Sequence, residues 1–159
     1  YGDGGAIFTN DDKLAELVRS YRVHGKGEDK YDNVRIGLNS RLDTIQAAIL
    51  LEKLAEFPTE LENRNIAAEN YAKTLSEKYT TPFVPDGYYS SWAQYTVVCE
   101  DRDSEMQGFK EQGIPTMVYY RTCMHLQTAF KDLGYKEGDF PVAEKLSKQV
   151  FSLPMHGYL

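Results

Sequence analysis

The strongest constraint in the sequence is a pair of apolar stripes with helical spacing that meet at Phe57-Pro58. Ser40 stands at capping-box spacing from Asp43, which predicts that a helix begins at Ser40. Proline disfavours helical geometry in the residue before it, so this helix is expected to end before Pro58 and another to begin at Thr59. The stripes consist of Leu42, Ile45, Ile49 and Leu50 before the proline, and of Ala67, Tyr71, Leu75 and Tyr79 after it.

The residues ahead of these stripes have the pattern of a short strand, a helix and a long loop. Gly4 to Phe8 predict a buried strand, and the polar side chains after it can cap a helix that runs to about Val23. Gly25 tolerates the left-handed conformation that ends such helices. The loop from there to Asn39 is longer than most connections, and loops of this length are often functional or disordered.

Beyond the second stripe the pattern changes to short elements, which are typical of a small α+β domain. The shift near Phe57-Pro58 is the best candidate for a domain boundary. We therefore expect an α/β chain in two parts, the tail of a larger α/β domain over 1–57 and a small α+β domain over 58–159. The expected short elements are strands at Gln94–Cys99 and Ile114–Tyr120 and helices at Ser104–Gln112, Leu126–Leu133 and Val142–Val150, the last opened by Pro141.

Composition places the chain among ordinary folded proteins and argues against two classes of partner. Its 159 residues are 42% hydrophobic and 26% charged, as in globular domains. No apolar run approaches the roughly 20 residues that a membrane-spanning helix needs. The net charge of −6 argues against a nucleic-acid surface, because such a surface draws most of its binding energy from clustered lysine and arginine. We therefore expect a protein that binds neither membranes nor nucleic acids.

Charge is distributed unevenly, because six basic and three acidic side chains lie in the segment from Arg19 to Arg41. This segment can hold a phosphate or a carboxylate, although a solvated loop would have the same composition. Cys99 and Cys123 match no zinc or redox spacing, which predicts reduced thiols in a cytoplasmic protein. No pattern of metal ligands is found, so no metal site is expected.

Three stretches that together span nearly the whole chain carry a resemblance. They are Tyr1–Asn10, which contains Gly-Asp-Gly-Gly, then Gly37-Leu38-Asn39-Ser40-Arg41-Leu42-Asp43, and finally the segment from Gly113-Ile114-Pro115 through His125-Leu126-Gln127 to Leu153-Pro154-Met155-His156. These stretches resemble the DegT/DnrJ/EryC1/StrS aminotransferases, a sugar-modifying branch of the fold-type I PLP enzymes. The second stretch is similar to the family's Gly-x-Asn-x-Arg-Leu-Asp pattern, and the third resembles members that act on UDP-linked 3-keto sugars.

The resemblance implies the C-terminal part of an enzyme that transfers an amino group, usually from glutamate, to a nucleotide-linked keto sugar for bacterial surface polysaccharides. In this family a lysine holds the cofactor pyridoxal 5′-phosphate (PLP) as a Schiff base, just upstream of the Gly-Asp-Gly-Gly strand. That position precedes Tyr1, so we expect no catalytic residue within this chain. We also expect this piece alone to be inactive and not to bind PLP.

The resemblance also implies roles for four residues. Asn39 reaches across a dimer interface to the PLP phosphate of the neighbouring subunit, where a neutral amide can donate a hydrogen bond. Arg41 points from the same loop toward the sugar or its carboxylate, unless it forms a surface ion pair with Asp32 or Asp43. Tyr120 and His125 lie in the substrate-facing segment, where their polar groups can bind a hexose or its nucleotide.

The assembly and two other functions follow from the same reasoning. The apolar faces of 1–57 need a partner, so a homodimer or larger self-assembly is expected. Some relatives replace the lysine with histidine and dehydrate the sugar, so the residue at the position of that lysine, upstream of Tyr1, distinguishes this PLP-dependent dehydratase from an aminotransferase. A non-catalytic dimerisation module is the third possibility, from another class of protein.

Overall fold

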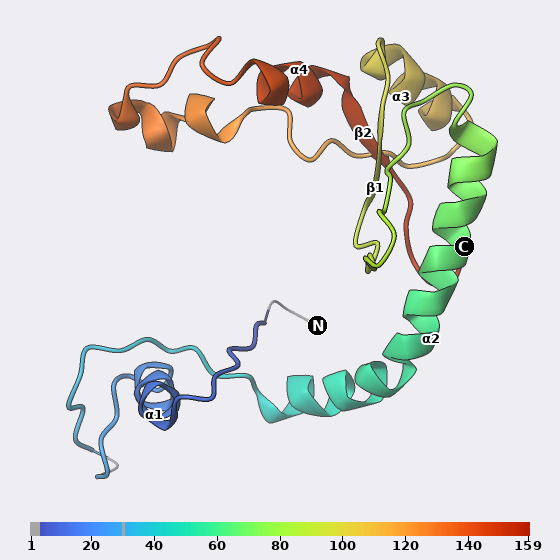
Figure 1. Cartoon of the computed structure of the whole chain (residues 1–159). Coiled ribbons are helices and arrows are strands. Elements are labelled where there is room, and N and C mark those ends of the chain that lie inside the picture. Colours follow the sequence, from blue (N-terminus) through green and yellow to red (C-terminus); the bar gives the residue numbers. More distant parts are fainter. Residues whose placement is uncertain (1–3, 30) are drawn as a thin grey trace. The chain divides into compact units, whose positions relative to one another are not determined.

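The computed structural model of the protein describes residues 4–29 and 31–159. The chain divides into two compact units, Tyr1–Glu56 and Phe57–Leu159. Among the residues described, none of the helices is long and apolar enough to cross a membrane. The elements, labelled in Figure 1 where space permits, are α1 (Asp12–Tyr21), α2 (Thr44–Leu75), β1 (Tyr95–Val98), α3 (Arg102–Glu111), the 3₁₀ helices η1 (Met124–Leu126) and η2 (Thr128–Leu133), α4 (Pro141–Gln149) and β2 (Val150–Leu153).

Helix α1 begins and ends as the sequence predicts. The Asp11 carboxylate accepts hydrogen bonds from the backbone N–H groups two and three residues further on, at 2.9 and 3.1 Å. After the helix ends at Tyr21, Gly25 adopts a left-handed conformation with φ +76°. A methyl group on Gly25 would lie 1.9 Å from the carbonyl oxygen of Arg35, so only glycine allows the loop to approach this closely.

The strand predicted at Gly4–Phe8 is not formed. The backbone there has no regular structure, and the side chains of Ile7 and Phe8 are 70% and 91% exposed. A strand requires a neighbour that satisfies its N–H and C=O groups, and residues 4–8 form no ladder with any other described segment. The prediction was wrong because an apolar pattern does not specify a pairing partner. Tyr1–Asp3, the start of the Gly-Asp-Gly-Gly stretch, lie outside the described residues.

Helix α2 runs through Pro58, so the two predicted helices are one. The start also differs, because the N–H of Asp43 donates to Gln46 Oε1 at 3.2 Å and thereby places the cap at Asp43, not at Ser40. Proline removes one helical hydrogen bond and costs about 3 kcal/mol within a helix. The alanine, leucine, glutamate and lysine residues on both sides favour helix, and the helix therefore continues across the proline.

The core of the Phe57–Leu159 unit is built on a two-stranded antiparallel sheet. Strand β1 pairs with β2 so that Tyr95 lies opposite Leu153 and Val97 lies opposite Phe151. These four side chains are at most 5% exposed and form the centre of the core. Single bridges extend the two edges of the sheet, from Thr80 to Val98 and from Met117 to Ser152.

The other predictions for this unit have mixed outcomes. Strand β1 and helices α3 and α4 confirm the predicted elements. The segment Ile114–Tyr120 forms only the bridge at Met117, because Pro115 has no N–H to donate to a ladder. The predicted helix at Leu126–Leu133 is also wrong: extended backbone at Gln127 separates the short helices η1 and η2. Strand β2 was not predicted, because it follows α4 without an intervening turn residue.

A charged contact joins the residues after α2 to helix α3. Glu105 Oε2 accepts hydrogen bonds from Lys78 Nζ at 2.6 Å and from the Tyr79 hydroxyl at 2.5 Å. These two bonds, that of Lys78 first, hold the pKa of Glu105 below its usual range. The ionised carboxylate therefore stabilises the fold above the ordinary value of 4.5, and this stabilisation is lost as the pH falls through the lowered pKa.

Glu105→Gln is expected to lower the free energy of unfolding by about 1–2 kcal/mol at neutral pH and to weaken the loss of stability in acid. Urea unfolding at neutral and acid pH, followed by the fluorescence of Trp92, the single tryptophan, measures both effects. The control is Glu69→Gln, which removes an exposed ion pair with Lys73 and is expected to cost less than about 0.5 kcal/mol. Equal losses for the two variants would contradict the assignment.

Candidate functional site

The loop between α1 and α2 is anchored to the end of α1, and the anchors fix the backbone of Asn39. The N–H of Leu38 donates to the carbonyl oxygen of Tyr21 at 2.7 Å, and the N–H of Ser40 donates to that of Arg22 at 2.9 Å. Asn39 lies between these two hydrogen bonds. Its side chain is exposed, but its position in the Tyr1–Glu56 unit is therefore well defined.

Arg41 contacts Asn39 directly. Its Nε donates to Asn39 Oδ1 at 3.3 Å. A guanidinium group can only donate, so the atom of the Asn39 amide that faces Arg41 is the oxygen Oδ1. The two hydrogens on Nδ2 are then left for another acceptor. Within the described residues, Arg41 forms no ion pair with Asp32 or Asp43. The structure thus brings the predicted cofactor-binding and substrate-binding residues of this loop together.

Three other basic residues of this segment, Arg19, Lys26 and Arg35, line one hollow that acidic side chains share. Arg35 Nη1 donates to Ser20 Oγ at 3.1 Å, and Ser20 Oγ donates to the carbonyl oxygen of Lys26 at 2.7 Å, so Arg35 braces the loop. An open hollow of about 550 Å³ lies beside them, and Glu16 and Glu28 line it together with the basic side chains. Lys30 lies outside the described residues.

Tyr119 and Tyr120 belong to the Phe57–Leu159 unit and follow the bridge at Met117. Their rings meet edge to face with centroids 5.6 Å apart. Tyr119 lines an open hollow of about 280 Å³ beside β2, and the Tyr120 side chain is 72% exposed. Tyr120 therefore lies on the surface, where it can contact a ligand, and not in the core.

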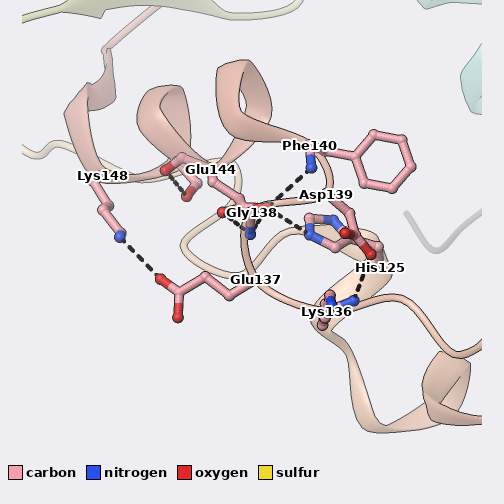
Figure 2. Close-up of polar contacts among 9 residues, drawn as sticks. His125, Lys136, Glu137, Gly138, Asp139, Phe140, Glu144 and Lys148 are labelled. Atoms are coloured by element: carbon pink, nitrogen blue, oxygen red, sulfur yellow. Dashed lines mark hydrogen bonds and ion pairs between the residues drawn. The ribbon is translucent and has the colours of Figure 1, made fainter.

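His125, by contrast, is largely buried against Glu144. Its side chain is 8% exposed, and its Nε2 lies 3.0 Å from Glu144 Oε1. The ring of Phe140 packs against the imidazole with a centroid distance of 4.7 Å. Figure 2 shows the two polar side chains facing each other, with the backbone of Gly138 and Phe140 around the same carboxylate.

Glu144 is the residue of this cluster that the sequence analysis missed. Its Oε1 accepts hydrogen bonds from the N–H groups of Gly138 at 3.0 Å and Phe140 at 3.1 Å, and Oε2 accepts from Gly138 at 2.9 Å. The Gly138 N–H is the main cause that lowers the pKa of Glu144, followed by the Phe140 N–H and His125. An acid shortly after Pro141 was a usable signal, because carboxylates satisfy unpaired N–H groups at helix starts.

The comparison with known proteins decides the family. The sequence matches the DegT/DnrJ/EryC1/StrS aminotransferase family over residues 1–159. The chain belongs to that family. A pleiotropic regulatory protein of Geobacillus stearothermophilus is 50% identical over 98% of this chain and 42% of its own length. The UDP-2-acetamido-2-deoxy-3-oxo-D-glucuronate aminotransferase of Pseudomonas aeruginosa is 45% identical over 100% of this chain and 44% of its own length.

A solved structure of the DegT/DnrJ/EryC1/StrS family supports the same assignment. A family aminotransferase from Brucella abortus is 50% identical, with a TM-score of 0.88 over 96% of this chain and 41% of that protein. The chain therefore spans less than half the length of these relatives. The expected fold, the C-terminal part of a fold-type I transferase, is confirmed, as is the likeness to members that act on UDP-linked 3-keto sugars. The enzymes of this family depend on PLP.

Proposed function

We propose that this chain is part of a PLP-dependent aminotransferase that transfers an amino group from glutamate to a nucleotide-linked keto sugar. The 45% identity with the Pseudomonas aeruginosa aminotransferase, over 100% of this chain, carries the proposal. The product would serve the synthesis of a bacterial surface polysaccharide in the cytoplasm. The two free cysteines, Cys99 and Cys123, agree with that compartment.

Asn39 fits the phosphate of PLP bound by a neighbouring subunit. Its Oδ1 is occupied by Arg41, so the Nδ2 hydrogens are the groups left to donate to a phosphate oxygen. Such a donor binds the phosphate without a charge that varies with pH. PLP, when bound, supplies the electron sink for amino transfer. The residues of this chain would contribute by holding the phosphate and orienting the sugar.

Arg41, Tyr120 and His125 are proposed to bind the sugar nucleotide. The planar guanidinium group of Arg41 suits the paired oxygens of a sugar carboxylate, and no acid in the described part of the chain neutralises it. The exposed hydroxyl of Tyr120 suits the hydroxyl groups of a hexose or a ribose.

The Tyr1–Glu56 unit exposes an apolar surface that needs a partner. None of the hydrophobic side chains among its described residues is buried. The exposed ones include Val34, Ile36, Leu38, Ile45, Leu51 and Leu54. We infer that residues 1–57 are the tail of the PLP-binding large domain, that 58–159 form the small domain, and that a second subunit or the remaining large domain covers these side chains.

This surface predicts the behaviour of the isolated chain. The 18.1 kDa polypeptide is expected to form dimers or larger assemblies, because exposed apolar patches of this extent rarely stay in contact with water. Sedimentation velocity over a range of concentrations measures the assembly. A monodisperse 18.1 kDa species throughout would contradict the prediction.

The protein produced from the whole reading frame that contains this chain tests the function. With PLP, glutamate and a UDP-linked 3-keto sugar, it is expected to form one 2-oxoglutarate for each amino sugar. Dehydration of the sugar without consumption of glutamate would identify the dehydratase, and the lack of both reactions would leave the dimerisation module. In that reading frame a lysine is expected a few residues before Gly2, upstream of Tyr1, where the dehydratase would have histidine.

A further inference from the structure

One carboxylate organises the segment that carries His125. Glu144 accepts three backbone hydrogen bonds at 2.9–3.1 Å from Gly138 and Phe140, and it lies 3.0 Å from His125 Nε2, 19 residues away in sequence. The helices η1 and η2 in this stretch contain no fully buried residue. The bonds to Glu144 therefore join His125 of η1 to the backbone of Gly138 and Phe140 ahead of α4 (Figure 2).

These hydrogen bonds show which atom carries the hydrogen in the contact between Glu144 and His125. Backbone N–H groups only donate, so the carboxylate that they surround is an acceptor, and its lowered pKa keeps it ionised at neutral pH. An ionised carboxylate cannot donate, and therefore Nε2 of His125 carries the hydrogen in the 3.0 Å contact. In the neutral imidazole the other ring nitrogen, Nδ1, is then a hydrogen-bond acceptor.

Nδ1 of His125 is available to a ligand. Within the described residues Nδ1 has no hydrogen-bond partner. Of the side-chain nitrogen and oxygen atoms described, those that are sealed from solvent and have no partner are Arg64 Nε and the Tyr95 hydroxyl oxygen, and Nδ1 is not one of them. Nδ1 is therefore in contact with solvent, although the side chain as a whole is 8% exposed. An acceptor on a buried ring of fixed orientation suits a hydroxyl donor, the group that sugars carry in greatest number.

We propose that Glu144 is a positioning residue that holds His125 through Nε2 and leaves Nδ1 to accept a hydrogen bond from a hydroxyl group of the sugar nucleotide. This inference rests on the proposed function and names the atom through which the segment after Tyr120 contacts the sugar. Glu144 does not touch the substrate. It acts by fixing the orientation of the imidazole.

Two replacements of His125 separate the roles of the two ring nitrogens. The amide nitrogen of glutamine can occupy the place of Nε2, so His125→Gln keeps the donor to Glu144 and removes the Nδ1 acceptor. Asparagine is shorter and can replace only Nδ1, so His125→Asn keeps an acceptor and removes the contact with Glu144. The control is Glu137→Ala, which removes an exposed pair with Lys148, 3.5 Å apart, near the same cluster.

The variants are compared in the protein from the whole reading frame, by steady-state kinetics and thermal unfolding. His125→Gln is expected to raise KM for the sugar nucleotide about tenfold, with kcat and Tm close to those of the unaltered protein. His125→Asn is expected to lower Tm, and Glu144→Ala to lower Tm and raise KM together. Glu137→Ala is expected to leave KM and Tm unchanged.

Each other outcome overturns part of the proposal. An unchanged KM in His125→Gln would overturn the role of Nδ1, and a loss of Tm in that variant as large as in His125→Asn would overturn the assignment of Nε2 to Glu144. If the unaltered protein transfers no amino group, the proposed function fails and the contact with the sugar fails with it. The comparison of Tm between the two His125 variants still decides which nitrogen faces Glu144.

Discussion

Replacing Phe151 with alanine is expected to lower the free energy of unfolding of the Phe57–Leu159 unit by about 3–5 kcal/mol. The residue is 0% exposed, and its ring clusters with the rings of Tyr79 and Phe109, whose centroids lie 5.7 Å from it and 6.5 Å from each other. Because Tyr79 follows α2 and Phe109 belongs to α3, separate segments hold these two neighbours, and they are not expected to close over the space that the missing ring leaves. The lost free energy therefore has two parts, the free energy of moving the ring from water into the core and the cost of the cavity that the ring leaves.

Urea unfolding followed by Trp92 fluorescence measures this loss, because that tryptophan packs against the same core. The matched control is Val142→Ala on α4, where the side chain is 73% exposed and the expected change is within about 0.5 kcal/mol. A loss below about 1 kcal/mol for Phe151→Ala would contradict the position of Phe151 at the centre of the core.

Arg41→Ala, made in the protein from the whole reading frame, is expected to lower kcat/KM at least about a hundredfold for a keto sugar that carries a carboxylate. The substitution leaves that carboxylate without its cation, and it also frees the Asn39 amide that Arg41 Nε now orients. Arg41→Lys keeps the charge but not the paired N–H groups, so its loss is expected to be intermediate.

The comparison of two substrates makes this prediction specific. A UDP-linked 3-keto sugar without a carboxylate is expected to be affected much less by Arg41→Ala, because the lost charge then has no partner. Arg22→Ala, an exposed arginine just after α1, is the control and is expected to change neither value. Equal losses for both substrates would contradict carboxylate binding by Arg41 and would point to a role through Asn39.

Elements with local signals could be predicted from the sequence, and those that depend on distant partners could not. The cap at Asp11 and the glycine at Gly25 act within one turn of α1, so residue types alone define that helix. Strand β2 exists because its backbone pairs with β1, a relation that no local pattern contains. Pro58 shows the opposite error, since a strong local signal for a helix end was overridden by helix-favouring residues on both sides.

The same distinction applies to the candidate site. Asn39 and Arg41 could be found because they are two residues apart in a specific motif, and the structure adds only the hydrogen bond between them. Glu144 could not be connected with His125, because the two residues are 19 positions apart and the 3₁₀ helix η2 lies between them. A residue pair that comes together only in the folded chain has no fixed spacing in the sequence.

The pairing of β1 with β2 also has a consequence for synthesis on the ribosome. Thr96 and Ser152, which face each other in the sheet, are 56 residues apart, so β1 emerges long before its partner exists. At ordinary translation rates this gap corresponds to about 3–11 s. During that time Tyr95 and Val97 have no strand to cover them, and the nascent chain presents them to chaperones until the segment ending at Leu153 has been made.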